Sequence, residues 1–265
     1  MSIKRSRGQA MTEFTIVAMV LMLLILGTLQ FALIYHAKIT LNYAAFETAR
    51  SGSINNARMW AMELGFARAM AALYTSPYVI DTGGVCSATF TFDPGRSVAD
   101  LADDRATDKP FNLDQVRCAR QRVRDMITDG LVRITLVNPS ADSFADHGPD
   151  GTIPNDNLMY RSAEVKGTSE QSIHDANLIK VNIGFCYELI VPLVDRLISR
   201  MISFAPTALE PENFGPQAAG SFGNACVTAL ESDGDVRYGI PLFSEGIMRM
   251  QSDAIEDSFC AGQCT

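Results

Sequence analysis

The chain begins with a long apolar run that predicts a membrane-spanning helix. No residue from Phe14 to Tyr35 is charged, and the only clearly polar residues in this run are Thr15, Thr28 and Gln30. About 22 residues at 1.5 Å per residue extend about 33 Å, which is enough to cross the hydrocarbon core of a bilayer. The threonine hydroxyls can bond back to their own helix, whereas Gln30 is costly against lipid and predicts a protein neighbour.

The helical pattern continues beyond the apolar run, so we expect one long helix from Gln9 to Arg50. Ser51, Gly52 and Ser53 then favour a break, and Asn55 or Asn56 could cap a second helix that runs to about Tyr74. This second helix has a stripe of methionine, leucine and aromatic residues, which predicts core packing and not a ligand site. The stripe consists of Met59, Trp60, Met62, Leu64, Phe66, Met70 and Leu73.

After Ser76 and Pro77 the apolar period changes to two, which indicates strands. We expect strands at Val85–Phe92, Val132–Val137, Leu178–Ile190 and Tyr238–Gln251. Two further helices are expected at Leu113–Asp129 and, with an amphipathic pattern, at Leu193–Phe204. Loops are expected at Asp93–Asn112, Ser140–Ser172 and Pro206–Gly223. The pattern therefore predicts an α+β fold, in which the long helix and the second helix pack against a small antiparallel sheet.

The charges predict the orientation in the membrane. Lys4, Arg5 and Arg7 precede the apolar run and only Lys38 follows it closely, so the N-terminus should be cytoplasmic and the large domain external. After Lys38 the chain has roughly 29 acidic and roughly 18 basic side chains, which gives no electrostatic basis for binding nucleic acid. A cleaved secretory signal peptide would have a shorter apolar region and a small-residue cleavage site. A plain signal anchor that carries a periplasmic binding or sensor domain remains the alternative.

Six cysteines follow the apolar run, and they predict disulfides. No two of them form a CxxC pair and no histidine is close to one in sequence, so a metal site is not expected. An even number in an exported domain predicts up to three disulfides with about 15 possible connectivities, against the alternative of reduced, buried thiols in a cytosolic domain. The six are Cys86, Cys118, Cys186, Cys226, Cys260 and Cys264.

The residues before the apolar run suggest a processing signal. Gly8, Gln9, Glu13 and Phe14 form the pattern Gly-x-x-x-x-Glu-aromatic, and a carboxylate at the mouth of a membrane helix is costly unless it has a function. This pattern resembles the prepilin peptidase signal of type IV pilin-like proteins. Together with the segment Ala44–Arg50, it resembles the TadE-like pseudopilins of tight-adherence (Tad) pilus systems over about 45 residues.

The resemblance has one departure and two weaker extensions. At Phe46-Glu47-Thr48 the family more often has a charged residue followed by glycine, but this difference does not touch the processing site. The strand Leu178–Tyr187 with the following Val191-Pro192-Leu193, and the segment Met248–Ser252, also look similar to the family.

The resemblance implies cleavage after Gly8, which divides the chain into a leader (1–8), a transmembrane stem helix (9–50, span about 14–35) and an exported α+β domain (51–265). Gln9 would then carry a free α-amine. Glu13 would lie one turn further on, at the positive end of the helix dipole. In an assembly of packed helices, its carboxylate could pair with the amine of a neighbouring subunit.

The function that the resemblance implies is that of a minor pilin that contributes to pilus assembly, adhesion and surface colonisation. The implied partners are a prepilin peptidase, other major and minor Tad pilins, the inner-membrane assembly platform and membrane lipid, without nucleic acid. The implied location is the bacterial inner membrane, crossed once with the C-terminal domain in the periplasm, or the pilus tip or fibre after assembly.

We expect no enzyme and no cofactor. The chain has three histidines and lacks the common metalloprotease, serine hydrolase and nucleotide-binding motifs. Two acidic loops could offer oxygen ligands to Ca²⁺, but neither has EF-hand spacing, so solvated loops are favoured. Their acidic residues are Asp142, Asp146, Asp150 and Asp156, and Glu231, Asp233 and Asp235. For Arg117, Arg120 and Arg124, which share a helical face, pairing with carboxylates is favoured over anion binding.

Overall fold

A computed structural model describes residues 9–75, 80–82, 85–87, 113–204, 222, 226 and 238–256. The chain forms two compact units, one of residues Met1–Ile39 with Gly184–Phe243 and one of residues Thr40–Ile183 with Ser244–Thr265. The first helix and two of the strands contribute residues to both units.

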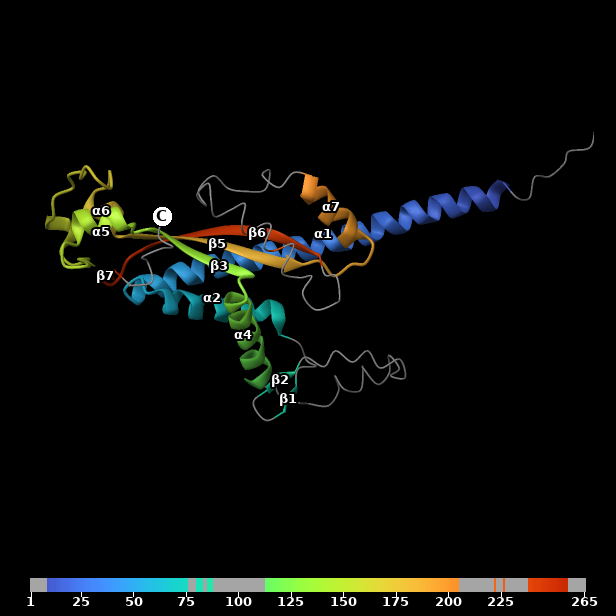
Figure 1. The fold of residues 1–265 in the computed structure, drawn as a ribbon, viewed down its shortest axis with the longest axis horizontal. Helices are drawn as coiled ribbons and strands as arrows, with labels where there is room; N and C mark the ends of the chain where they lie inside the picture. The colour runs from blue at the N-terminus through green and yellow to red at the C-terminus, as the bar shows by residue number, and fades with distance from the viewer. Residues whose placement is uncertain are drawn as a thin grey trace, which may run out of the picture. The chain divides into compact units, whose positions relative to one another are not determined.

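The elements are, in chain order, α1 (Gln9–Ile54), α2 (Met59–Tyr74), β1 (Ile80–Thr82), β2 (Val85–Ser87), α4 (Leu113–Thr128), β3 (Val132–Asn138), α5 (Ala141–His147), β4 (Thr152–Ile153), the 3-10 helix η1 (Leu158–Tyr160), α6 (Ile173–Ala176), β5 (Leu178–Glu188), α7 (Val194–Phe204), β6 (Gly239–Arg249) and β7 (Ala254–Ile255) (Figure 1). The main sheet has the order β3-β5-β6, and β1-β2 and β4-β7 form antiparallel pairs. The predicted α+β class, with a long apolar helix, further helices and a small antiparallel sheet, is confirmed.

In the second unit, the later part of α1 packs closely against α2 and β6. A Cβ on Gly65 of α2 would lie 2.7 Å from the Cβ of Ser51, and a Cβ on Gly246 of β6 would overlap the carbonyl oxygen of Ala45. Glycine at both positions lets the backbones approach more closely than any side chain would allow. The α1 residues buried in this unit are Leu41, Ala44, Ala45, Thr48, Ala49, Gly52 and Ser53.

The predicted helix break at Ser51–Ser53 is wrong, because α1 continues to Ile54. The hydroxyl of Ser53 donates to the carbonyl of Arg50 at 2.8 Å, and a Cβ on Gly52 would lie 2.6 Å from Cδ1 of Ile179, so this glycine serves packing. The predicted caps of the second helix are also wrong, because its N-cap is Arg58 without a side-chain hydrogen bond.

The turn between α1 and α2 uses the two asparagines in another way. Asn55 donates from Nδ2 to the carbonyl of Ser51 at 2.8 Å and so satisfies the C-terminal end of α1. Asn56 and Ala57 have φ angles of 60° and 57°, which reverse the chain before α2 begins. Of the predicted stripe on α2, Met62, Phe66 and Met70 are buried, whereas Trp60 is exposed.

The predicted strands Val132–Val137, Leu178–Ile190 and Tyr238–Gln251 agree with β3, β5 and β6 to within two residues. β5 lies between β3 and β6, and residues 181–187 are buried without the alternation expected of a half-exposed strand, so both faces of β5 are covered over this stretch. The predicted loop Ser140–Ser172 is wrong in part, since it contains α5, β4 and η1. The residues predicted as strand or loop at 88–112, and most of those at 206–223, lie outside the described part of the chain.

Candidate membrane and assembly helix

The predicted processing residues lie at the start of α1. The helix begins at Gln9, and Glu13 and Phe14 lie in its second turn with exposed side chains. Gly8 lies outside the described residues. The scissile bond and the role of Glu13 therefore remain predictions.

The first part of α1 presents large apolar side chains that the rest of the described chain leaves uncovered. Phe14 is 72% exposed and Leu24 is 65% exposed. Among the described residues, α1 is the one helix that is long and apolar enough to cross a membrane, with a mean hydropathy of 2.5 and 6% of the most apolar window buried. Such a surface requires lipid or other apolar helices around it.

The polar residues of the apolar run behave as predicted. The hydroxyl of Thr15 donates to the carbonyl of Met11, and that of Thr28 donates to the carbonyl of Ile25, each at 2.8 Å. These bonds satisfy both hydroxyls within the helix, so neither threonine needs a partner from outside.

Gln30 has the protein neighbour that its position predicts. Its side chain is fully buried, and its Oε1 accepts a hydrogen bond from the backbone N–H of Val191 at 2.8 Å. Within the described residues, its Nε2 has no hydrogen-bond partner. The neighbour comes from the segment between β5 and α7, so the chain itself covers α1 at this position.

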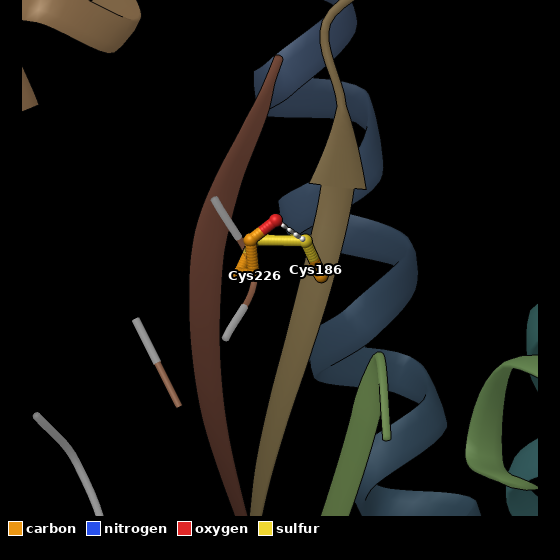
Figure 2. The surroundings of a disulfide bond; sticks show 2 residues. All are labelled: Cys186 and Cys226. Carbon is orange, nitrogen blue, oxygen red and sulfur yellow. Dashed lines mark hydrogen bonds between the residues drawn. A yellow bond between two sulfur atoms is a disulfide. The ribbon is translucent and has the colours of Figure 1, made fainter. Parts of the chain in front are cut away.

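The structure contains a disulfide between two of the predicted cysteines. Cys186 on β5 and Cys226 are joined with a Cα–Cα distance of 5.4 Å (Figure 2), and both are buried. Cys118 is disulfide-bonded as well, and no described cysteine is reduced. Cys260, Cys264 and the side chain of Cys86 lie outside the described residues. Disulfides are typical of a compartment outside the cytoplasm.

The first acidic loop shows structural roles for two of its carboxylates. The backbone N–H groups of Ser169 and Thr168 donate to Asp146 at 2.7 Å and 3.2 Å, and these bonds hold the pKa of Asp146 below its usual range. Asp156 pairs with Arg161 at 2.6 Å. In the described ranges, no three histidine, cysteine or acidic side chains form a group that could hold a metal ion. The second acidic loop, around residues 231–235, lies outside them.

The arginines of α4 show a contact that the sequence did not predict. The guanidinium of Arg122 lies 5.3 Å from the centre of the Tyr74 ring, a cation–π contact between α4 and α2. This contact joins the two helices, which is a structural role.

Comparison with known proteins identifies the N-terminal segment. Residues 8–50 match the family model described as TadE-like protein. No curated protein and no solved structure matches the chain. The matched residues begin at Gly8 and cover α1 as far as Arg50, and this match confirms the resemblance that the sequence indicated. Residues 8–50 are thus a TadE-like segment, of the kind found in the pilins of Tad systems.

Proposed function

We propose that this protein is a minor pilin of a Tad-type pilus and that it contributes to pilus assembly, adhesion and surface colonisation. The observation that carries the proposal is the coincidence of the TadE-like match, residues 8–50, with α1. The first part of this helix is apolar and uncovered, and its later part is packed into the folded chain. This division fits a subunit that inserts its helix into a membrane first and among other pilin helices later.

The proposed location before assembly is the bacterial inner membrane, with one crossing. The basic residues before the helix favour a cytoplasmic N-terminus. The disulfide Cys186–Cys226 supports a periplasmic location for the following domain. The proposed partners are the assembly platform in that membrane and the other major and minor pilins.

The proposed processing is cleavage by a prepilin peptidase after Gly8. The described part of α1 starts at Gln9, the residue that would become the new N-terminus. Glu13 would then lie one helical turn from the new α-amine, on a surface open to a neighbouring subunit. Pairing of the Glu13 carboxylate with the amine of the neighbour would reduce the cost of placing either charge in hydrocarbon.

Mass spectrometry of the mature N-terminus tests the processing step. In cells with an active prepilin peptidase, we expect the protein to begin at Gln9. Gly8→Ala should slow the cleavage, because a β-carbon would crowd the peptidase subsite. Recovery of the intact N-terminus, with Met1, from such cells would refute the proposal.

Co-purification with the other pilins tests the assembly step. We expect Glu13→Ala and Glu13→Gln to be processed normally but to be incorporated poorly, because one partner of a buried charge pair is lost, a change worth about 3–5 kcal/mol. Glu47→Ala is the matched control, since Glu47 is an acidic residue in the later, packed part of α1, where its carboxylate pairs with Arg50 at 3.7 Å. If both Glu13 variants are processed and co-purify like the wild type, the charge-pairing role is wrong.

A helix exchange separates a pilin from a signal-anchored binding or sensor domain. Residues 14–29 would be replaced by an unrelated apolar helix of equal length, with Gln30 kept. A pilin should then remain in the membrane but lose piliation, because its helix surface must fit other subunits. Normal piliation after the exchange would favour the signal anchor. Immunogold labelling would show whether the protein lies at the tip or along the fibre.

A further inference from the structure

Helix α7 has the pattern of a helix that lies on a surface between apolar and polar phases. Among its described side chains, Val194, Leu197 and Ile198 are apolar and share one side, on which Val194 is buried. Arg196 and Arg200 lie away from this side, and Asp195 lies at the edge between the two. Leu197 is 53% exposed, so the apolar side is not fully used by the core.

Two further apolar side chains extend this exposed surface before the helix begins. Ile190 is 67% exposed and Leu193 is 65% exposed. Both flank Val191, which is buried and whose N–H donates to Gln30. The carbonyl of Val191 accepts from the N–H of Asp195 at 3.1 Å, so the chain turns directly from this contact into α7.

The contact with Gln30 fixes this surface beside the apolar part of α1. Residues 1–39 and 184–243 form one compact unit, so the contact lies within that unit, and α7 starts three residues after Val191. On the N-terminal side of Gln30, the α1 side chains of residues 11–29 are mostly exposed and apolar. Residues 31–36 on the other side of Gln30 are again mostly exposed, so the start of α7 lies beside the uncovered apolar part of α1, near its outer end.

We propose that α7, with Ile190 and Leu193, lies in the interface of the membrane that α1 crosses and binds anionic phospholipid. The exposed side chains of Ile190, Leu193 and Leu197 contact the acyl chains, and the exposed guanidinium groups of Arg196 and Arg200 contact the lipid phosphates. The two arginines are one helical turn apart, and Asp195 is the one acidic residue of the helix.

With the outer boundary of the hydrocarbon near Tyr35, the contact of Gln30 with Val191 lies five residues, or about 8 Å, inside it. This depth is within the range at which amphipathic helices lie in the membrane interface. The oxygen of Gln30 and the N–H of Val191 satisfy each other there without water. The inference rests on the proposed anchoring of α1 and adds a second membrane contact to it.

Fluorescence of the full chain in vesicles tests the depth of α7. In a Trp60→Phe background, Leu197→Trp places one reporter on α7, and Val165→Trp places one at a position that is also open, with 65% exposure for Val165 and 53% for Leu197. In vesicles of phosphatidylglycerol and phosphatidylcholine, we expect the reporter at 197, but not the one at 165, to be quenched by lipids brominated near the headgroup. An unquenched reporter at 197 would overturn the inference, including the case in which a second protein copy covers α7.

Flotation of the same samples separates this inference from the proposed anchor. A chain that fails to float with the vesicles refutes the anchoring of α1, and the proposed function with it. A chain that floats but leaves the reporter at 197 unquenched refutes the role of α7 alone.

Two double variants test whether Arg196 and Arg200 bind anionic lipid. Arg196→Gln with Arg200→Gln should lower the ratio of quenched to unquenched reporter by up to about 30-fold in vesicles that contain phosphatidylglycerol. Arg68→Gln with Arg249→Gln removes the same charge from two exposed positions elsewhere and should leave the ratio unchanged. An equal ratio for the two double variants would overturn the assignment of Arg196 and Arg200 to lipid phosphates.

Discussion

Residues 11–29 and residues 37–54 belong to one continuous helix, yet their side chains differ in size and surroundings. The first segment is rich in leucine, isoleucine, methionine and valine, and most of these side chains are exposed. The second has one buried side made largely of small residues, among them Ala37, Ala44, Ala45, Ala49 and Gly52. Large apolar side chains on all sides suit a fluid apolar solvent, whereas small ones on one side let a neighbouring backbone approach.

The comparison shows that hydropathy alone does not locate the membrane boundary on α1. By length and composition, the whole of Met11–Ile54 qualifies as a membrane span, although about 20 residues suffice to cross a bilayer. What separates the two segments is the packing around them. In the second segment, close contacts with Gly65 and Gly246 replace lipid as the apolar environment.

The largest difference between the segments should appear in the free energy of unfolding when one leucine in each is replaced by alanine. Leu41 is fully buried, so Leu41→Ala should lower the free energy of unfolding by about 2–5 kcal/mol through lost burial and a cavity. Leu24 is 65% exposed, so Leu24→Ala should change it by less than about 0.5 kcal/mol. Urea unfolding in detergent micelles measures both. Equal losses would show that the first segment is also packed within the chain.

Replacing a glycine by alanine in each environment should change the free energy of unfolding by less than the leucine variants do, and with opposite signs. Gly246→Ala should cost about 1–3 kcal/mol of unfolding free energy, since the new Cβ would lie 2.7 Å from the carbonyl carbon of Ala45, which is backbone and cannot rotate away. Gly27→Ala meets no atom within 4 Å and should raise the helix stability by about 1 kcal/mol. Thermal unfolding in micelles is the measurement, and a stabilising Gly246→Ala would contradict the close packing of β6 on α1.

The sequence predicts the long elements of this fold better than the short ones. α1, α4, β5 and β6 depend on apolar periods sustained over 11 or more residues, and their predicted positions are close to the observed ones. α5 depends on a local capping box between Ser140 and Ser143, and β4 on pairing with β7 about 100 residues later. Short elements fixed by single side chains or distant partners leave no periodic signal.

The features of α1 divide in the same way, into those that the sequence predicts and those that depend on the fold. The polarity of Gln30 within an apolar run predicts that it has a protein neighbour, but Val191 is 161 positions away in the chain, so its identity requires the fold. The break at Ser51–Ser53 was predicted from local preferences, which lose to the packing of Gly52 against Met62 and Ile179. The processing residues at the start of α1 are predicted from their resemblance to a family and not from a physical period.

Gln30, the one buried side chain between residues 11 and 36, sharpens the comparison between the uncovered and the packed segment of α1. Gln30→Leu removes the acceptor of the Val191 N–H and should cost about 1 kcal/mol of unfolding free energy, because the loss of the bond is partly offset by removal of a buried Nε2. Thr28→Val is the control, because the Thr28 hydroxyl bonds within its own helix. Urea unfolding in micelles should show a smaller loss for Thr28→Val, and a larger one would contradict the role of Gln30.

Lys38, at the start of the covered segment, should give the smallest effect, visible only as a dependence on pH. Its Nζ donates to the carbonyl of Phe243, and burial of the ammonium lowers the pKa of Lys38 from its ordinary value. A lowered pKa means that the folded chain releases this proton before the unfolded chain does. The free energy of unfolding should therefore rise with pH between the folded pKa and the ordinary value near 10.5.

Lys38→Met isolates this contribution, because methionine keeps an unbranched apolar stem without the charge. We expect the stability of the wild type relative to Lys38→Met to be highest above pH 10.5 and to fall as the pH is lowered through the folded pKa of Lys38. Unfolding in micelles at closely spaced alkaline pH values is the measurement. A relative stability that instead rises as the pH is lowered would mean that the ammonium form is favoured by folding, as in an ion pair. In that case Lys38 would belong to a charged surface, and the covered segment of α1 would begin after it.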